Sequence, residues 1–456
     1  MGTVADSPPE NSAPPRAPDE LTLREALELA VRYQRAEQLD VAESVYRRVL
    51  EVAPEQPDAL HFLGVLLHQR GKHGEALELL RRAIELEPEF AGFHQNLGNV
   101  CFETERYGEA AQAYERCLQL APNDPATYNN LGVVRRAQGQ LEAAAAAYRK
   151  AIEIDPRHPD AYHNMGNLLT AQGRIKEAVT YLCTSMTLRP PHPESRRLLA
   201  LAYAHLGRLA DAVGVYHKWL EEEPNDPIAH HMLAACGGAN VPARASDEFV
   251  QMVFDSFALS FDAKLEKLHY RAPQLVAAEL ARIHGQPQGS LLALDAGCGT
   301  GLSAPLIAPF AARLTGVDLS AQMLAKARVR GGYDELIQAE LTHYLRAHPA
   351  EFDLIVSSDT LCYFGALDAV LETARSALRT GGTFIFTVEH VEGGKVAEVG
   401  YRLNPHGRYS HSEAYLRPLL GVKGFEVLGM TQAVLRMESG CPVAGLVVSV
   451  RKAGEH

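Results

Sequence analysis

A glycine-rich segment in the second half of the chain is the part best suited to hold a ligand. The apolar run LLALD, residues 291–295, is followed by Gly297, Gly299 and Gly301 and then by a helical pattern. Glycines at such a point let the backbone approach a ligand closely, and the N–H groups at the start of the helix face that ligand. The spacing alone leaves the ligand open, because residues 299–304 also fit the GxGxxA variant of the dinucleotide-binding pattern.

Two acidic residues accompany the glycines. Asp295 ends the first apolar run, and Asp318 ends the next one, LTGVD. With them, this part of the sequence resembles the class I S-adenosylmethionine-dependent methyltransferases, whose first motif is DxGxGxG and whose second strand ends in an acidic residue. The resemblance implies that residues 295–301 hold the methionine end of S-adenosylmethionine (SAM) and that Asp318 accepts hydrogen bonds from its ribose hydroxyls. Nicotinamide enzymes use the same acidic device, so Asp318 alone does not distinguish the two cofactors.

The same resemblance assigns further residues to the cofactor. Leu319 and Met323 would pack against the adenine, although Met323 also suits a plain helix core. Glu340, at the end of the predicted third strand, would lie near the adenine amino group or remain a solvated charge. Residues 254–273 resemble the aromatic-rich lid of such enzymes, and Tyr270 within them would contact the cofactor carboxylate or pack in the core.

Short apolar runs alternate with amphipathic helical segments through this half of the chain. Four of these runs, rich in β-branched and aromatic residues, are LLALD, LTGVD, FDLIVSS and GTFIFTVE. Strands that alternate with helices at this spacing predict an α/β doubly wound sheet of the Rossmann-like kind. We therefore expect a class I methyltransferase domain over residues 248–456.

The segment after the third of these runs, SSDTLCYFGALD, follows the predicted fourth strand and holds candidates for the chemistry. By the resemblance it faces the sulfonium, with Cys362 where many relatives carry a histidine and with Tyr363 as a catalytic candidate beside it. A sulfonium methyl group is already electrophilic, so the enzyme mainly has to align the nucleophile and exclude water. A general base, where the acceptor needs one, would be His390, Asp359 or His411. The alternative for a single histidine in a loop is a surface position or a structural hydrogen bond, without a role in catalysis.

The segment YRLNPHGRYSHS, residues 401–412, is dense in aromatic and cationic side chains and precedes the predicted last helix. This composition indicates an insertion that faces the substrate, with Tyr409 among its contacts. Arg402 or Arg408 would hold a carboxylate or phosphate of the acceptor, because a guanidinium pairs with both in a bidentate manner. The alternative is that these arginines are ordinary surface residues.

The first half of the chain repeats with a period of 34 residues. Small residues share two registers, aromatic or leucine residues share a third, and prolines recur at Pro54, Pro88, Pro122, Pro156, Pro190 and Pro224. This pattern resembles the tetratricopeptide repeat (TPR), a helix–turn–helix unit in which small residues stand where two helices touch. It predicts an α-helical solenoid over residues 21–235, made of about six repeats and a capping helix. We expect a linker at residues 236–247 and a disordered tail at residues 1–20.

Asparagine recurs at one register of the central repeats, as Asn96, Asn130 and Asn164, and again three residues later as Asn99 and Asn167. If this line of amides lies on the concave face, it can bind a peptide backbone, because an amide both donates and accepts hydrogen bonds. The arrangement resembles the asparagine ladders of some peptide-binding TPR proteins. Asparagine is also common at this place in the repeat, so the register does not by itself establish binding.

The composition of the chain indicates which partners and which cellular compartment suit the protein. The formal charge of −12 disfavours nucleic acid as a partner, because binding would begin against repulsion. No stretch approaches the roughly 18 apolar residues of a membrane-spanning helix, and the N-terminus lacks the features of a secretory signal. The seven cysteines are scattered without a CxxC pair, which predicts free thiols, no zinc ribbon and a cytoplasmic protein.

Taken together, the chain resembles the predicted TPR-containing methyltransferases of bacteria. Our first hypothesis is an SAM-dependent methyltransferase whose repeats recruit a protein, peptide or carrier-bound acceptor. The second is a methyltransferase of a small metabolite whose repeats serve assembly only. The third is a TPR scaffold with a cofactor-binding domain that does not catalyse, and a nicotinamide oxidoreductase is a distant fourth.

Overall fold

The structure is a computed structural model that describes residues 21–190, 193–392, 400–438 and 440–454. The predicted disordered tail, residues 1–20, lies outside these ranges. The chain forms two compact units, Met1–Ser195 and Arg196–His456. We describe each unit by itself. No helix within the described ranges is long and apolar enough to cross a bilayer.

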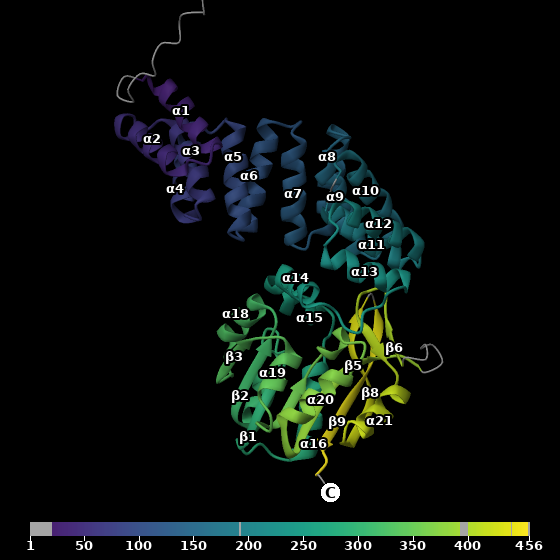
Figure 1. Ribbon diagram of the computed structural model, residues 1–456. Coiled ribbons are helices and arrows are strands. Elements are labelled where there is room, and N and C mark those ends of the chain that lie inside the picture. Colours follow the sequence, from purple (N-terminus) through teal and green to yellow (C-terminus); the bar gives the residue numbers. More distant parts are fainter. Residues whose placement is uncertain (1–20, 191–192, 393–399, 439, 455–456) are drawn as a thin grey trace, which may run out of the picture. The chain divides into compact units, whose positions relative to one another are not determined.

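The first unit is built of successive antiparallel helix pairs (Figure 1). The helices are α1 (Leu23–Arg35), α2 (Leu39–Val52), α3 (Pro57–Gln69), α4 (His73–Leu86), α5 (Ala91–Glu103), α6 (Tyr107–Leu120), α7 (Pro125–Ala137), α8 (Leu141–Ile154), α9 (Pro159–Ala171) and α10 (Ile175–Leu188). Helix α11 (Pro193–His205) begins in this unit and ends in the second. The predicted TPR solenoid is confirmed.

Small residues allow the two helices of each pair to touch. A Cβ placed on Gly98 would lie 2.6 Å from Cε1 of Tyr114, and one on Gly132 would lie 2.5 Å from Cε1 of Tyr148. Ala110 and Ala144, in the second predicted register, are fully buried. Because packing at this density leaves no room for a methyl group, the 34-residue recurrence of glycine has a direct steric cause.

The second unit begins with helices and continues into a mixed sheet. Its helices are α12 (Leu209–Glu222), α13 (Pro227–Gly237), α14 (Asp247–Phe257), η2 (Ala258–Ser260), α15 (Phe261–Lys267), α16 (Ala272–His284), α17 (Ala304–Ile307), η3 (Ala308–Phe310), α18 (Ala321–Arg330), α19 (Leu341–Ala347), η4 (Leu361–Tyr363), α20 (Asp368–Ala377) and α21 (Glu413–Val422). Its strands are β1 (Leu291–Ala296), β2 (Ala311–Asp318), β3 (Glu335–Gln338), β4 (Phe352–Ser357), β5 (Leu378–His390), β6 (Tyr401–Leu403), β7 (Tyr409–His411), β8 (Phe425–Glu438) and β9 (Cys441–Lys452).

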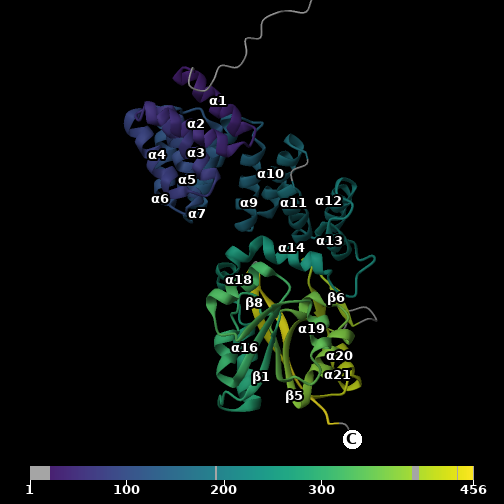
Figure 2. The same cartoon turned by 60° about the vertical axis from the view of Figure 1, so that its left-hand side comes forward.

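The sheet is parallel through β3, β2, β1, β4 and β5, in that spatial order. Figure 2 shows β1 and β5 in this sheet. Strand β9 then pairs antiparallel with β5, and β8 pairs antiparallel with β9. The short hairpin β6–β7 joins the end of β5 through Glu389 and His390. The strand order reverses between β1 and β4, and in open α/β sheets the crevice at such a reversal is where ligands bind.

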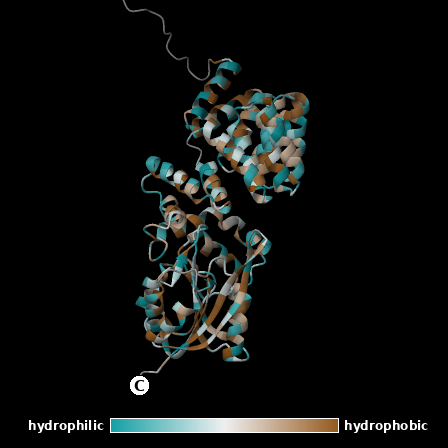
Figure 3. Ribbon diagram, turned by 90° about the vertical axis from the view of Figure 1, so that its right-hand side faces the viewer, coloured by the Kyte–Doolittle hydropathy of each residue, from teal (hydrophilic) through white to brown (hydrophobic). Residues whose placement is uncertain are grey.

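Alternate side chains of the strands enter two separate cores. Leu294 and Ile355 pack with α19, α20 and α21, whereas the neighbouring Ala293 and Leu354 pack with α16 and α17. The central strands are therefore buried on both faces. In Figure 3 strands of this unit carry much of its brown, hydrophobic colour. This arrangement confirms the predicted doubly wound, Rossmann-like domain.

Candidate functional site

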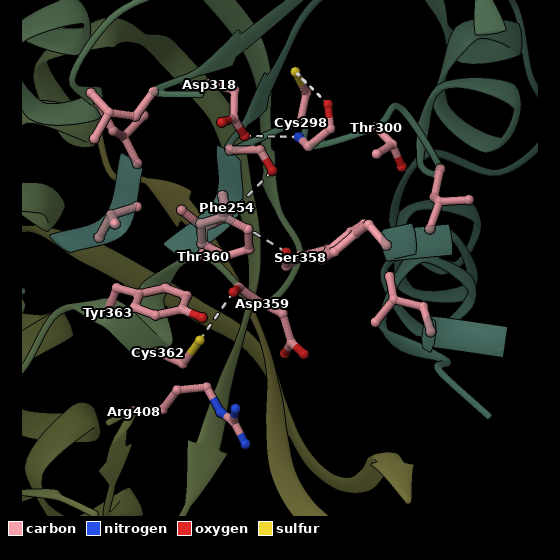
Figure 4. Close-up of a pocket in the computed structure, with 18 of the residues that line it drawn as sticks. Phe254, Cys298, Thr300, Asp318, Ser358, Asp359, Thr360, Cys362, Tyr363 and Arg408 are labelled. Carbon is pink, nitrogen blue, oxygen red and sulfur yellow. Dashed lines mark hydrogen bonds between the residues drawn. The ribbon is translucent and has the colours of Figure 1, made fainter. Parts of the chain in front are cut away.

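A cavity of about 290 Å³ opens at the carboxyl ends of β1, β2 and β4, the place that the strand order predicts. The glycine-rich loop after β1, the ends of β2 and β3, and the loop after β4 line its walls. Helices α14 and α15 line another side, and Figure 4 shows Phe254 from α14 and Asp318 from β2 in this cavity. The cavity thus brings together residues that are far apart in the sequence.

The glycine-rich loop is tied closely to its neighbours. The N–H groups of Gly297 and Cys298 donate to the carbonyl oxygen of Val317 in β2, at 2.8 and 3.0 Å. Gly297 has a φ of +82°, and a Cβ there would lie 2.0 Å from Oγ1 of Thr360. Gly299 also has a positive φ, of +54°, and a Cβ there would meet no atom within 4 Å. The loop therefore needs glycine for its backbone conformation and presents open space beside Gly299.

Asp318 fixes this loop to the end of β2. Its Oδ2 accepts from the N–H of Gly299 at 2.9 Å, and its Oδ1 accepts from the N–H of Ser320 at 2.9 Å. Burial raises the pKa of the Asp318 carboxyl, while these backbone N–H groups lower it. The carboxylate lines the cavity and keeps further lone pairs for a ligand, because each oxygen accepts two hydrogen bonds.

Asp295 lies beneath the loop and is only 1% exposed. Its Oδ2 accepts from the hydroxyl of Tyr333 at 2.7 Å, whereas its Oδ1 is buried without a hydrogen-bond partner in the described part of the chain. Burial raises the pKa of Asp295 from 3.8 to about 7. A buried carboxylate oxygen without a donor is costly. Asp295 itself is not among the residues that line the cavity.

The predicted adenine contacts divide into two groups. Leu319 and Glu340 line the cavity, whereas Met323 is 1% exposed in the core side of α18 and does not line it. Glu340 caps the N-terminus of α19, since it accepts from the N–H groups of Thr342 and His343 at 3.0 and 2.7 Å. Its carboxylate oxygens are thus largely occupied by the protein itself.

The predicted lid lies over the cavity as α14, η2 and α15. Phe254, Phe257 and Phe261 contact one another at ring distances of 5.7 to 6.0 Å and line the cavity with Tyr270. Two carboxylates of the lid reach the loops that follow β1 and β2, because Asp255 accepts from the Ser320 hydroxyl and Asp262 accepts from the Thr300 hydroxyl. Arg330 of α18 also pairs with Asp262. These bonds fasten α14 and α15 to the glycine-rich loop and to α18.

The loop after β4 supplies Asp359, Cys362, Tyr363 and Phe364 to the cavity. Asp359 has a φ of +55°, a conformation that is uncommon for a residue other than glycine. The thiol of Cys362 donates to the Asp359 carbonyl at 3.0 Å, and burial raises the pKa of that thiol. The ring of Tyr363 meets Phe254 of the lid edge to face at 5.4 Å (Figure 4). Of the residues predicted to take part in the chemistry, Tyr363 and Asp359 line the cavity.

A buried ionic cluster closes this end of the cavity. Arg436 pairs with Asp359 at 2.5 Å, with Glu438 at 2.7 Å and also with Glu389. Arg408 pairs with Glu389 and Glu438, both at 2.6 Å. The predicted anion-binding Arg408 therefore already holds two carboxylates of the protein. Glu389, Arg436 and Glu438 had no motif to mark them, because two strands distant in sequence, β5 and β8, bring them together.

Other predicted residues of the second unit lie outside the described cavity wall. His411 is fully buried, with Nε2 2.9 Å from the Gly365 carbonyl oxygen, and burial lowers its pKa to about 4. His390 contacts the His411 carbonyl oxygen at 3.3 Å. Tyr409 is buried and donates to the Pro242 carbonyl at 2.8 Å, and Arg402 is exposed. Gly301, which also lies away from the wall, has a φ of +84°.

The asparagine register of the first unit lies along one side of a groove of about 630 Å³. Asn96, Asn99 and Asn130 line this groove, and Asn99 accepts from the hydroxyl of Tyr114 at 2.7 Å. Nδ2 of Asn96 lies 2.7 Å from Nε2 of His61 in the preceding repeat. Asn164 donates to Asn129 at 2.9 Å and does not line the described groove. The amides therefore form a line that crosses neighbouring repeats.

Two family profiles match this chain. The one described as "Methyltransferase domain" covers residues 294–386, from β1 into β5. The one described as "Cilia and flagella-associated protein 70 C-terminal domain" covers residues 22–253. The two matches together cover the repeats, the beginning of α14 and most of the parallel part of the sheet. Both predicted parts of the chain, the TPR solenoid and the class I methyltransferase domain, are confirmed.

Individual proteins match shorter parts of the chain. A ubiquinone biosynthesis O-methyltransferase of Thiobacillus denitrificans is 28% identical over 184 residues, which are 35% of this chain and 78% of the relative. A malonyl-[acyl-carrier protein] O-methyltransferase of Enterobacter lignolyticus is 32% identical over 135 residues, 29% of this chain and 53% of the relative. The crystal structure of MamA covers 35% of this chain and 93% of its own, at 26% identity and a TM-score of 0.33. The chain thus spans about half the length of the second methyltransferase.

Proposed function

Because the chain belongs, through residues 22–253, to the family described as Cilia and flagella-associated protein 70 C-terminal domain and carries a methyltransferase domain at residues 294–386, we propose that it methylates a recruited acceptor. SAM is the proposed methyl donor. The repeats would recruit the acceptor as a protein, a peptide or a carrier-bound group. Asp318, which lines the cavity and fastens the glycine-rich loop through the N–H of Gly299, is the observation that carries the assignment of the cofactor.

The residues of the cavity fit SAM. The ammonium group of its methionine end would lie against the glycine-rich loop, beneath which Oδ1 of Asp295 is buried outside the cavity wall and lacks a donor among the described residues. The ribose hydroxyls supply donors for the remaining lone pairs of Asp318, which lines the cavity. Open space beside Gly299 leaves room for the ligand against the loop. When bound, SAM supplies a methyl group that is electrophilic because it is attached to a positively charged sulfur.

The chain's own residues then have two tasks, to exclude water and to orient the acceptor. The aromatic rings of the lid exclude water from the cavity. Burial raises the pKa of Tyr363, so its phenol stays protonated and can donate a hydrogen bond to the acceptor. Among the predicted bases, Asp359 lines the cavity, and it is held in place by Arg436. We assign proton removal, where the acceptor requires it, to Asp359.

Isothermal titration of the full chain with S-adenosylhomocysteine (SAH) tests the cofactor assignment. We expect saturable binding with one site, and an increase in the melting temperature with SAH that NAD⁺ does not produce. Binding of NAD⁺ without binding of SAH would establish the oxidoreductase alternative instead. Binding of SAH without any methyl transfer to host proteins or metabolites would favour the scaffold hypothesis.

The proposed role of the repeats rests on the amide-lined groove of the first unit. Asn96 and Asn130 flank it from neighbouring repeats, and both can pair with a peptide backbone. We expect the double variant Asn96→Ala, Asn130→Ala to lose transfer of labelled methyl groups to host protein while its affinity for SAH stays unchanged. Loss of SAH binding as well would indicate misfolding, and unchanged labelling would remove the groove from the reaction. Labelling of small metabolites alone would favour the second hypothesis.

We also propose a cytoplasmic setting. All seven cysteines are free thiols, and five of them are buried. Unpaired cysteines in this number are typical of proteins from a reducing compartment.

A further inference from the structure

The segment 242–245, which belongs to the predicted linker, is bound along the loop that follows β4. The carbonyl oxygen of Ala243 accepts from the N–H groups of Gly365 and Ala366, at 2.9 and 2.8 Å. The N–H of Ala245 donates to the carbonyl of Tyr363 at 2.8 Å. Arg244, between them, forms an antiparallel bridge with Phe364. The segment therefore acts as a short added strand whose partner is the wall of the cavity.

This pairing places the side chain of Arg244 in the cavity wall, at the end where Glu340 lies. Its Nη1 is 2.8 Å from Oδ1 of Asp247 and 3.3 Å from Oε1 of Glu340. The guanidinium carbon lies 5.9 Å from the ring centroid of Phe364. The side chain is 40% exposed, so it is neither buried in the core nor free in solvent. A planar cation is thus held at the rim of the cavity by two carboxylates.

The position of Arg244 differs from that of the other arginines in the wall. Arg408 and Arg436 are held within the buried cluster with Glu389, and among the described residues Arg244 pairs with none of its carboxylates. Leu319, which follows the end of β2, and Glu340, which follows the end of β3, flank the part of the cavity nearest Arg244. In the proposed complex this is the nucleoside end. Because Glu340 is occupied as a helix cap and by Arg244, it is poorly placed to serve the purine alone.

We propose that Arg244 is a cofactor-binding residue that stacks on the purine of SAM. The paired segment 242–245 positions it in the site. A guanidinium stacks on a heteroaromatic ring and donates to ring nitrogens, whereas an ammonium group does neither with the same geometry. This inference rests on the proposed function. It adds that residues upstream of the methyltransferase domain complete its cofactor site.

The added strand is also continuous with the core of the last repeat. One apolar cluster contains Trp219 of α12, Met232 of α13, Ala245 of the segment and Phe249 of α14, and Tyr363 packs against it. Trp219 is the single tryptophan of the sequence. Its fluorescence therefore reports on this cluster alone, and we expect it to change when a ligand orders Arg244 and its segment.

Titration of the full-length protein with SAH and with 5′-methylthioadenosine, which lacks the amino-acid end of SAH, tests the proposal. We expect Arg244→Ala to weaken both ligands by about tenfold or more, and Arg244→Lys to weaken them by a smaller factor. Equal loss for both ligands would locate the contact at the nucleoside. The matched control is Arg328→Ala, an exposed arginine of α18 outside the described cavity wall, which should bind both ligands as the wild type does.

Two results would overturn the proposal. One is an affinity of Arg244→Ala for both ligands within twofold of wild type. The second is a loss for SAH that spares 5′-methylthioadenosine, which would place the contact at the amino-acid end. If the wild type binds neither ligand, the proposed function fails along with this inference, whereas normal binding by Arg244→Ala leaves the proposed function intact.

Discussion

The backbone N–H of Gly299 donates to Oδ2 of Asp318 at 2.9 Å, so the loop after β1 is fastened to the last residue of β2. The same carboxylate accepts from Ser320 through its other oxygen. One side chain therefore sets the position of the loop and also offers lone pairs to the cavity. Loss of this carboxylate should disturb both functions.

We predict that Asp318→Ala lowers the affinity for SAH by at least tenfold, because it removes the ribose acceptor and frees the glycine-rich loop. Asp318→Asn retains one oxygen acceptor and should lose less. Isothermal titration measures both effects. Asp211→Ala, which removes a surface carboxylate of α12, is the control, and equal affinities for Asp211→Ala and Asp318→Ala would contradict the assignment.

Gly297→Ala should abolish SAH binding and destabilise the fold. The added Cβ would lie 2.0 Å from Oγ1 of Thr360, in a backbone conformation with φ of +82°. Strain of this backbone type costs on the order of 1–3 kcal/mol, and the clash adds to it. Gly381→Ala separates the two causes, since Gly381 has a φ of +78° and no atom within 4 Å of its Cβ position. Chemical denaturation should show a larger loss for Gly297→Ala, and equal losses would exclude the clash.

Asp295 should make stability depend on pH near neutrality. Its pKa of about 7 in the folded protein lies above its ordinary value, so folding favours the protonated form. The stabilisation is complete below about pH 4 and is lost as the pH rises through 7; it amounts to at most on the order of 4 kcal/mol. Asp295→Asn should remove most of this decline between pH 5 and pH 8. Urea unfolding at both pH values measures it, and an unchanged slope in the variant would show that another group titrates.

The same carboxyl predicts how binding responds to pH. An ionised Asp295 attracts the ammonium group of SAH, whereas the neutral acid does not, so affinity should rise severalfold from pH 6 to pH 8. The Asp295→Asn variant should bind SAH more weakly and show a flat profile over this range. His411, whose pKa is about 4, stays neutral throughout and does not contribute. An affinity that falls with rising pH in the wild type would argue against the pairing.

Arg436→Ala should destabilise the second unit by about 3–5 kcal/mol, because it leaves buried carboxylates without their cation. The side chain of Arg436 is 5% exposed and pairs with Asp359, Glu389 and Glu438. Arg24→Ala removes an arginine that is 89% exposed and should cost less than about 1 kcal/mol. Urea unfolding compares the two variants. A loss below 1 kcal/mol for Arg436→Ala would mean that the cluster carries no net stabilisation.

Local patterns of the sequence predicted the elements and the loop at the cofactor end. The recurrence of glycine opposite a tyrosine, as in Gly98 and Tyr114, follows from contact between neighbouring helices, so it leaves a periodic trace. Asp295, the next-to-last residue of β1, and Asp318, the last residue of β2, lie at the same edge because parallel strands place their carboxyl ends together. The other contacts of the site join residues that are distant in the sequence and form only in the folded protein. Arg244 and Glu340 are 96 residues apart, and no spacing in the sequence connects them.

The segment dense in aromatic and cationic residues illustrates the limit. Its composition predicted contact with substrate, yet Tyr409 and His411 point into a core and bond with backbone carbonyls. Aromatic and cationic side chains occur both on binding surfaces and in packed hairpins. Which of the two forms depends on whether another element of the fold packs against them. Here α13 and residues around Pro242 cover the hairpin, a partner that a local pattern cannot reveal.

The contact between His231 of α13 and the Gly407 carbonyl, at 2.8 Å, bears on how such a fusion can be rearranged. His231 also stacks on Phe249 at 4.0 Å, so the final helix of the repeats is a buried layer of the second unit. A methyltransferase cassette excised at residue 248 would leave Leu403 and Tyr409 uncovered and prone to self-association. A methyltransferase domain that is fused to another repeat array therefore has to keep α12, α13 and the paired segment 242–245.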